Sequence, residues 1–218
     1  MTRWLRRSMD AVSVAALVAV LVVSTSGAAS AAEAGAVQTV SAQVALAALE
    51  QALRYVEAGV PYQLGGKITL EEYLALKEAD PEAAATRGVD ASGVVVNAYR
   101  AVLPDLQLLA GPPEQGRKAT YVTSDALFRY NTVPVPLEQA QPGDLVFFRS
   151  AGGDSIGGVG IVSTISGRIV RVVVASASRG RVVEIGIDTQ GDYWARNVAG
   201  LGRLIYQGAA ATPATATP

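Results

Sequence analysis

The residues best suited to chemistry lie around position 91. Asp90 and Ser92 flank Ala91 where an apolar helix is expected to begin, and they offer a carboxylate and a hydroxyl. A serine nucleophile needs a base, yet the chain has no histidine, the commonest base near neutral pH, and no cysteine. This composition excludes thiol catalysis, disulfides and thiolate metal sites. Carboxylate chemistry at Asp90 remains open.

These residues belong to the second of four short motifs along the chain. Each one alone is weak evidence, because a Pro-Gly-Asp turn before a strand, for example, is common. The four in this order, with helices and strands expected between them, form a much more specific pattern. They are Pro61-Tyr62-Gln63-Leu64-Gly65-Gly66, Asp90-Ala91-Ser92-Gly93, Gln141-Pro142-Gly143-Asp144-Leu145-Val146-Phe147-Phe148, and Gly158-Val159-Gly160-Ile161-Val162, with Val174-Ala175-Ser176 a strand later.

Taken together, the motifs resemble those of the NlpC-type family of peptidoglycan endopeptidases, which have a papain-like fold. The resemblance covers roughly residues 45–206. It implies an α+β domain in which N-terminal helices pack on an antiparallel sheet of about five strands. It also implies where the catalytic residues of an active member would lie.

The resemblance implies that the catalytic residues themselves are absent. In the family, the second motif carries a cysteine nucleophile at a helix N-terminus, the fourth begins with the histidine that activates it, and a polar residue on the next strand orients that histidine. This sequence has Ala91, Gly158 and Val174 at those positions. We therefore predict a pseudoenzyme, with a residual hydrolase of non-thiol chemistry as a distant alternative. No metal or other cofactor is indicated.

Three residues that the resemblance assigns to the substrate's amino-terminal end are present: Tyr62, Asp90 and Ser92. Asp90 could pair with the free ammonium of a stem peptide, while Tyr62 and Ser92 supply neutral hydrogen bonds. An equally good interpretation is structural, with Asp90 as a helix cap and Tyr62 packed over Gly65 and Gly66. The sequence leaves both interpretations open.

The elements that must position these residues follow from the spacing of apolar side chains. Helical spacing fills the first half of the chain, and short β-branched runs separated by turns fill the second. Helices followed by strands favour an α+β fold. Helices are predicted over 37–57, 70–79, from 90 towards 104, and over 122–130, and strands over 144–148, 159–165, 169–175, 182–187 and 201–206.

One stretch departs from the resemblance. Between Gly66 and Asp90 lie 23 residues, where family members commonly have a short loop. This insertion, residues 67–89, would lie near the groove entrance and could cover it or present a surface to a partner. Its acidic side chains are more simply a solvated helix face: Glu71, Glu72, Glu78, Asp80 and Glu82.

The chain ends have compositions of their own. Residues 1–32 combine an arginine-bearing leader, an apolar run and small residues, which predicts a signal peptide; an uncleaved anchor is the alternative. The apolar run is short for a membrane span, so none is expected after cleavage. Residues 33–207 are predicted to form a single domain. Residues 208–218, rich in Ala, Thr and Pro, are predicted to be a disordered tail.

Composition and motifs together limit the function. The net charge of the 218-residue chain is −1, which gives no support for a nucleic-acid partner. We expect a secreted or periplasmic protein of the cell envelope that binds peptidoglycan stem peptides without cleaving them. The alternative is a regulatory pseudoenzyme that presents the same fold to another envelope protein.

Overall fold

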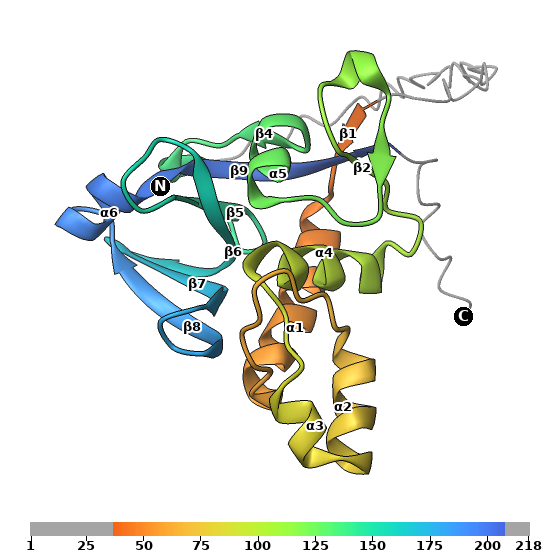
Figure 1. Ribbon diagram of the computed structural model, residues 1–218. Coiled ribbons are helices and arrows are strands. Elements are labelled where there is room, and N and C mark those ends of the chain that lie inside the picture. Colours follow the sequence, from red (N-terminus) through yellow and green to blue (C-terminus); the bar gives the residue numbers. More distant parts are fainter. Residues whose placement is uncertain (1–36, 208–218) are drawn as a thin grey trace, which may run out of the picture. The chain divides into compact units, whose positions relative to one another are not determined.

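A computed structural model describes residues 37–207 of the chain (Figure 1). The predicted signal peptide and the predicted tail lie outside these residues, and so do residues 33–36. No helix within the described part is long and apolar enough to cross a membrane.

The first long helix, α1 (Ala42–Ala58), begins later than the sequence pattern suggested. The Ser41 hydroxyl accepts a hydrogen bond from Val44 N and so fixes the start of the helix. Residues Val37–Thr39 form strand β1, which pairs with the last strand of the sheet. The prediction of a helix from residue 37 was therefore wrong, because backbone pairing with a distant strand is not visible in local spacing.

Three other predicted helices are present: α2 (Leu70–Ala79), α4 (Ala91–Val102) and α5 (Ser124–Tyr130). Two short helices, α3 (Pro81–Ala85) and α6 (Asp192–Asn197), were not predicted, since one or two turns hold too few apolar residues to show a period. Two 3₁₀ turns, η1 (Pro113–Gln115) and η2 (Leu137–Gln139), complete the helical elements.

The sheet is antiparallel and has seven strands. The five predicted strands are present as β5 (Leu145–Arg149), β6 (Ile156–Ser166), β7 (Ile169–Ser176), β8 (Arg181–Asp188) and β9 (Val198–Gln207). Two additional strands, β1 and β4 (Thr132–Pro134), have three residues each, and both pair with β9. The strand order is β1-β9-β5-β6-β7-β8. The predicted α+β fold is confirmed, with more strands than the five expected. Strands β2 (Leu108–Leu109) and β3 (Lys118–Ala119) form a separate antiparallel pair.

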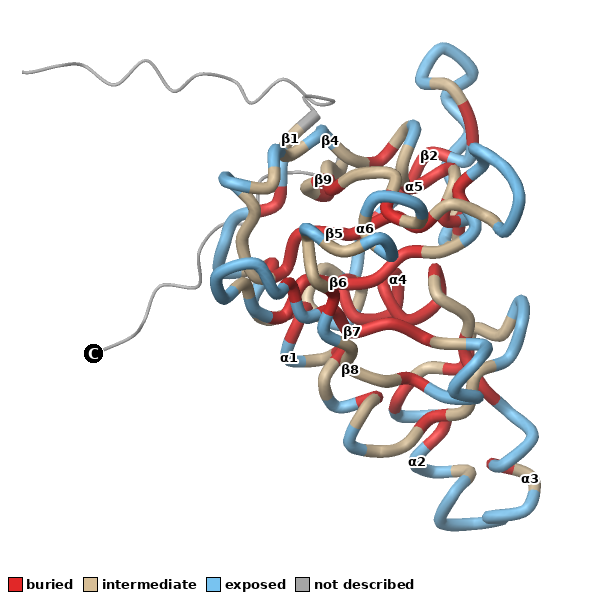
Figure 2. The backbone as a smooth tube through the Cα atoms, turned by 90° about the vertical axis from the view of Figure 1, so that its left-hand side faces the viewer, coloured by how far each residue is buried: buried red, intermediate tan, exposed pale blue. Residues whose placement is uncertain are grey.

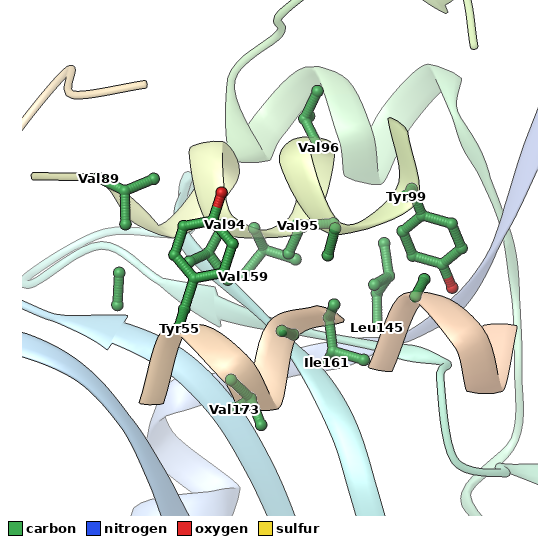
Figure 3. Packing of buried hydrophobic residues seen from close by; sticks show 14 of the residues in the cluster. Tyr55, Val89, Val94, Val95, Val96, Tyr99, Leu145, Val159, Ile161 and Val173 are labelled. Carbon is green, nitrogen blue, oxygen red and sulfur yellow. The ribbon is translucent and has the colours of Figure 1, made fainter. Parts of the chain in front are cut away.

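Each face of the sheet has its own hydrophobic core. The first core lies under α1, α4 and α5, where Val94 and Val95 of α4 meet Val159 and Ile161 of β6 (Figure 3). The second core covers the opposite face and includes strand residues such as Val174, with Trp194 of α6 packed against it. Helix α4 and the central strands are buried almost throughout, whereas α2 and α3 are largely exposed (Figure 2).

The Pro-Gly-Asp motif forms a turn that is hydrogen-bonded to several elements of the fold. The Asp144 carboxylate is fully buried, and Arg203 of β9 donates to both its oxygens at 2.8 and 2.9 Å. Asp144 also accepts a hydrogen bond from Gln141 N at 2.9 Å, which closes the turn before β5. The buried Tyr99 hydroxyl of α4 donates to Gly143 O at 2.6 Å. One turn thus ties together α4, β5 and β9.

We predict that Asp144→Ala lowers the free energy of unfolding by about 3–5 kcal/mol, because it leaves Arg203 and the Gln141 N–H without their acceptor. Urea denaturation of the full chain measures the change. The matched control is Asp192→Ala, which breaks an exposed ion pair with Arg196 and should have little effect. Equal stability losses in the two variants would contradict the role assigned to Asp144.

Candidate functional site

The N-terminus of α4 is organised by Asp90. One carboxylate oxygen, Oδ1, accepts the Gly93 N–H at 2.6 Å and caps the helix. The structural role that the sequence suggested for Asp90 is therefore present. Ala91, the first residue of the helix, is half-buried, and Ser92 is buried. The helix end presents the methyl group of Ala91 and the hydroxyl of Ser92.

Two backbone segments hold this helix end in place. Val89 N donates to Pro61 O, Gln63 N donates to Val89 O, and Asp90 N donates to Gly66 O, at 3.0 to 3.1 Å. Gly66 allows this close approach, since an added Cβ would overlap the carbonyl oxygen of residue 88. Gly88 and Gly93 are similarly confined: a Cβ on residue 88 would overlap the residue 61 carbonyl, and one on residue 93 would lie 2.8 Å from the residue 66 carbonyl.

A cavity of about 430 Å³ opens beside the helix end. All three residues predicted to bind substrate line it, together with Ala91. The remaining wall comes from residues 64–67, from the segment that leads into the first residue of α5, and from the start of β6. These other lining residues are Leu64, Gly65, Lys67, Tyr121, Val122, Thr123, Ser124, Ile156 and Gly157.

Lys67 is the one cationic residue that lines this cavity. Its Nζ donates to Asp90 Oδ1 at 2.6 Å and to Ser92 Oγ at 2.8 Å, and Ser92 Oγ donates in turn to Asp90 Oδ1 at 2.9 Å. The Lys67 side chain is 28% exposed and the Asp90 side chain 16%, so the ion pair is partly shielded from water. Lysine, aspartate and serine form a closed triangle of hydrogen bonds.

Asn97 joins the residue after Lys67 to Tyr121, which lines the cavity. This buried α4 side chain donates to Ile68 O at 2.9 Å, and its oxygen accepts the Tyr121 hydroxyl at 2.7 Å. Burial raises the pKa of Tyr121, which keeps the hydroxyl protonated as a donor. The Tyr121 ring then lies 5.8 Å from Lys67 Nζ, within the range of a cation–π contact.

The sequence matches a protein-family model described as the NlpC/P60 family, over residues 59–200. The matched region contains all four motifs and the cavity. The chain belongs to the NlpC/P60 family. This is a family of cysteine peptidases, and its domains have functions related to the cell wall.

One solved structure is similar to this chain at low sequence identity. A solved structure described as similar to a lipoprotein of the NLP/P60 family, from Staphylococcus aureus subsp. aureus Mu50, is 21% identical to this chain. The alignment covers 78% of this chain and 44% of that one, with a TM-score of 0.49. The present chain thus spans less than half the length of that relative. No curated protein matches the sequence.

The three positions assigned to the catalytic residues of NlpC/P60 enzymes do not converge. Ala91 packs against the first core. Val174 of β7 belongs to the second core, and a Cβ added to Gly158 of β6 would contact Phe148, also of the second core, at 3.6 Å. Gly158 and Val174 therefore face away from Ala91. Ala91 lies at the start of its helix, as the motifs predict, and the assignment of the three positions to catalytic residues stays a prediction.

Neighbouring residues occupy the places that face α4. Ile156 and Gly157 line the cavity from β6, and Val173 and Ala175 of β7 belong to the first core. A one-residue difference in alignment reverses the face of a strand residue, and β6 also has a register shift against β5 at this end. None of these four residues carries an acid, base or nucleophile.

Lys67 was not foreseen as a site residue. It directly follows Gly66, the last residue of the first motif, and this position could have indicated a place beside the site. The prediction instead assigned Lys67 to the insertion at 67–89. The two helices of that insertion, α2 and α3, contribute no residue to the cavity wall. Among the described residues, the insertion therefore reaches the cavity through Lys67, at its first position, and does not cover it.

The Lys67–Ser92 contact is part of a network that also includes the Asp90 carboxylate. A lysine base must be neutral to take a proton from the hydroxyl, whereas Lys67 forms an ion pair with Asp90 as an ammonium. Ser92 uses its hydroxyl to accept from Lys67 and to donate to Asp90. Hydroxyl, ammonium and carboxylate satisfy one another, which stabilises the helix end.

We predict that Gly66→Ala lowers the free energy of unfolding by about 1–3 kcal/mol or more, since backbone must move to admit the methyl group. The change should be measured by urea denaturation of the full chain. Gly153→Ala is the matched control: its added Cβ would meet no atom closer than 3.9 Å, so an effect within about 0.5 kcal/mol is expected. A neutral Gly66→Ala would show that the backbone contact at Gly88 is not tight.

Proposed function

We propose that this protein is a catalytically inactive NlpC/P60 domain that binds peptidoglycan stem peptides at the cell envelope. The observation that carries the proposal is a retained cavity beside a helix end that has lost its nucleophile. The cavity is lined by Tyr62, Asp90 and Ser92, while Ala91 supplies only a methyl group. A receptor needs the first feature, and a thiol hydrolase also needs the residue that is missing.

The cavity is suited to the polar backbone of a peptide. The hydroxyl-bearing residues Tyr62, Tyr121, Thr123 and Ser124 line it together with apolar ones. Hydroxyls both donate and accept hydrogen bonds, so they can match amide N–H and C=O groups alike. Leu64 lies on the rim with 84% of its surface exposed and offers an apolar contact to an incoming chain.

The proposal of inactivity rests on the residues available for catalysis. The chain has no thiol and no imidazole, and the hydroxyl nearest the nucleophile position is engaged by Lys67 and Asp90. Loss of a nucleophile together with its base removes a rate enhancement on the order of a millionfold in well-studied triads. Export to the envelope is part of the same proposal, motivated by the composition of residues 1–32.

A protein-interaction role is the second candidate, favoured by the surface of the insertion. A cavity of about 720 Å³ lies between α1, α2 and α4, on the other side of Tyr121. Leu74 of α2 lines it and is 41% exposed, and Arg54 and Glu78 lie on its wall. A partner protein could insert an apolar side chain there without entering the smaller cavity.

We predict that the purified protein does not cleave peptidoglycan fragments and that thiol reagents change none of its properties. Ala91→Cys alone should also remain inactive, because the chain has no imidazole to take the thiol proton and pass it to the leaving amine. Mass spectrometry of stem-peptide digests measures cleavage. Turnover by the wild type, or by Ser92→Ala, would show that another residue performs hydrolysis and would overturn the proposed inactivity.

We predict that the protein sediments with purified peptidoglycan and that Leu64→Ala weakens this binding about tenfold, the loss expected for removing one well-buried leucine contact. Leu46→Ala on α1 is the matched control, since Leu46 is also an exposed leucine (46%) but lies away from the cavity. Co-sedimentation at increasing peptidoglycan concentration gives the affinities. Absence of binding by the wild type would favour the protein-interaction role.

A further inference from the structure

We propose that Lys67 sets the ligand specificity of the cavity, so that it accepts peptides whose amino end is acylated and excludes peptides with a free ammonium. The inference rests on the proposed peptide-binding function and gives it a ligand class. Its basis is the position of the Lys67 ammonium, which already occupies the carboxylate that would bind the amino end of a ligand.

The Asp90 oxygen that caps the helix, Oδ1, has no capacity left for a second ammonium. Its Oδ1 atom accepts from Lys67 Nζ at 2.6 Å, from Gly93 N at 2.6 Å and from Ser92 Oγ at 2.9 Å. A carboxylate oxygen has two lone pairs, so three donors saturate it. The other oxygen, Oδ2, accepts no hydrogen bond from the described residues, and an ammonium bound to it would lie next to Lys67. An ammonium bound at Oδ1 would have to displace Lys67.

Both of these routes are unfavourable. Displacing Lys67 breaks its bonds to Asp90 and Ser92 and the contact of its ammonium with the Tyr121 ring. Placing a second ammonium beside Lys67 brings two like charges together in a partly shielded site, where repulsion is stronger than in water. An amino end that carries a charge is therefore disfavoured.

The charges of the cavity wall balance internally. Among the residues that the structure describes, Lys67 and Asp90 are the charged ones that line it, and they neutralise each other. An uncharged, hydrogen-bonding group is the occupant that such a wall favours. An amide fits, because its carbonyl can accept the third Lys67 N–H, which bonds to no other described residue, and its N–H can donate to a nearby hydroxyl.

An acylated amino end is the state of a stem peptide that is still attached to its glycan strand, where an amide replaces the ammonium. Peptides released from the glycan have a free amino end. The arrangement at Lys67 thus points to a receptor for intact wall rather than for released peptides. Peptide length and the identity of the later residues are left to the rest of the cavity.

The test is isothermal titration calorimetry of the full chain with the dipeptide L-alanyl-γ-D-glutamate, in its free-amine and N-acetylated forms. The wild type should bind the acetylated form at least about tenfold more tightly. In Lys67→Met, the carboxylate is released, and the preference should reverse towards the free amine. Lys77→Met is the matched control, because Lys77 is a lysine of α2 outside the cavity that bonds to Ala58 O, and it should leave the preference unchanged.

The outcomes separate this inference from the function on which it rests. Equal affinities, or tighter binding of the free amine by the wild type, would overturn the inference and leave peptide binding intact. An unchanged preference in Lys67→Met would show that Lys67 is not the determinant. If the wild type binds neither dipeptide nor peptidoglycan, the proposed function itself fails, and the inference fails with it. Should Lys67→Met not fold, the wild-type comparison alone decides.

Discussion

The site depends on the close approach of three backbone segments at the buried N-terminus of α4. Segments 61–66 and 88–90 hydrogen bond to each other and to the helix end, and glycines at 66, 88 and 93 leave the space for this contact. A buried helix end must satisfy its free N–H groups, which Asp90 does for Gly93. The first two motifs are therefore explained by packing before any ligand is considered.

The same geometry is compatible with the small and apolar residues that this chain has at the positions assigned to catalysis. Each catalytic position of an NlpC/P60 enzyme also belongs to a helix or strand that the core requires. Ala91 packs against the first core, and the cavity-facing residues Ile156 and Gly157 lie where β6 begins. Small and apolar residues can fill such positions without loss of burial, because the fold depends on volume and hydrogen bonding rather than on nucleophilicity.

The ion pair between Lys67 and Asp90 sets the electrostatic character of the site. A capping carboxylate in a partly shielded cavity attracts any available cation, and the chain supplies its own from the residue after Gly66. Asn97 and Tyr121 hold the backbone and the ring that surround this lysine. The cavity thereby keeps its shape and its hydrogen-bonding groups while carrying no net charge.

The sequence alone determined the fold class, the family and the absence of thiol and imidazole chemistry, because these depend on composition and on motifs of adjacent residues. Helix α1 starts at Ala42 rather than at residue 37, because Ser41 caps it and residues 37–39 pair with β9 as strand β1. Strand pairing joins residues that are far apart in the chain, so local spacing does not predict it. Tertiary structure also decided which strand residues face α4, because a shift of one residue reverses the face of a strand. It alone placed Lys67 on Asp90: the two are 23 positions apart, and only the folded backbone brings an insertion's first side chain to a helix cap.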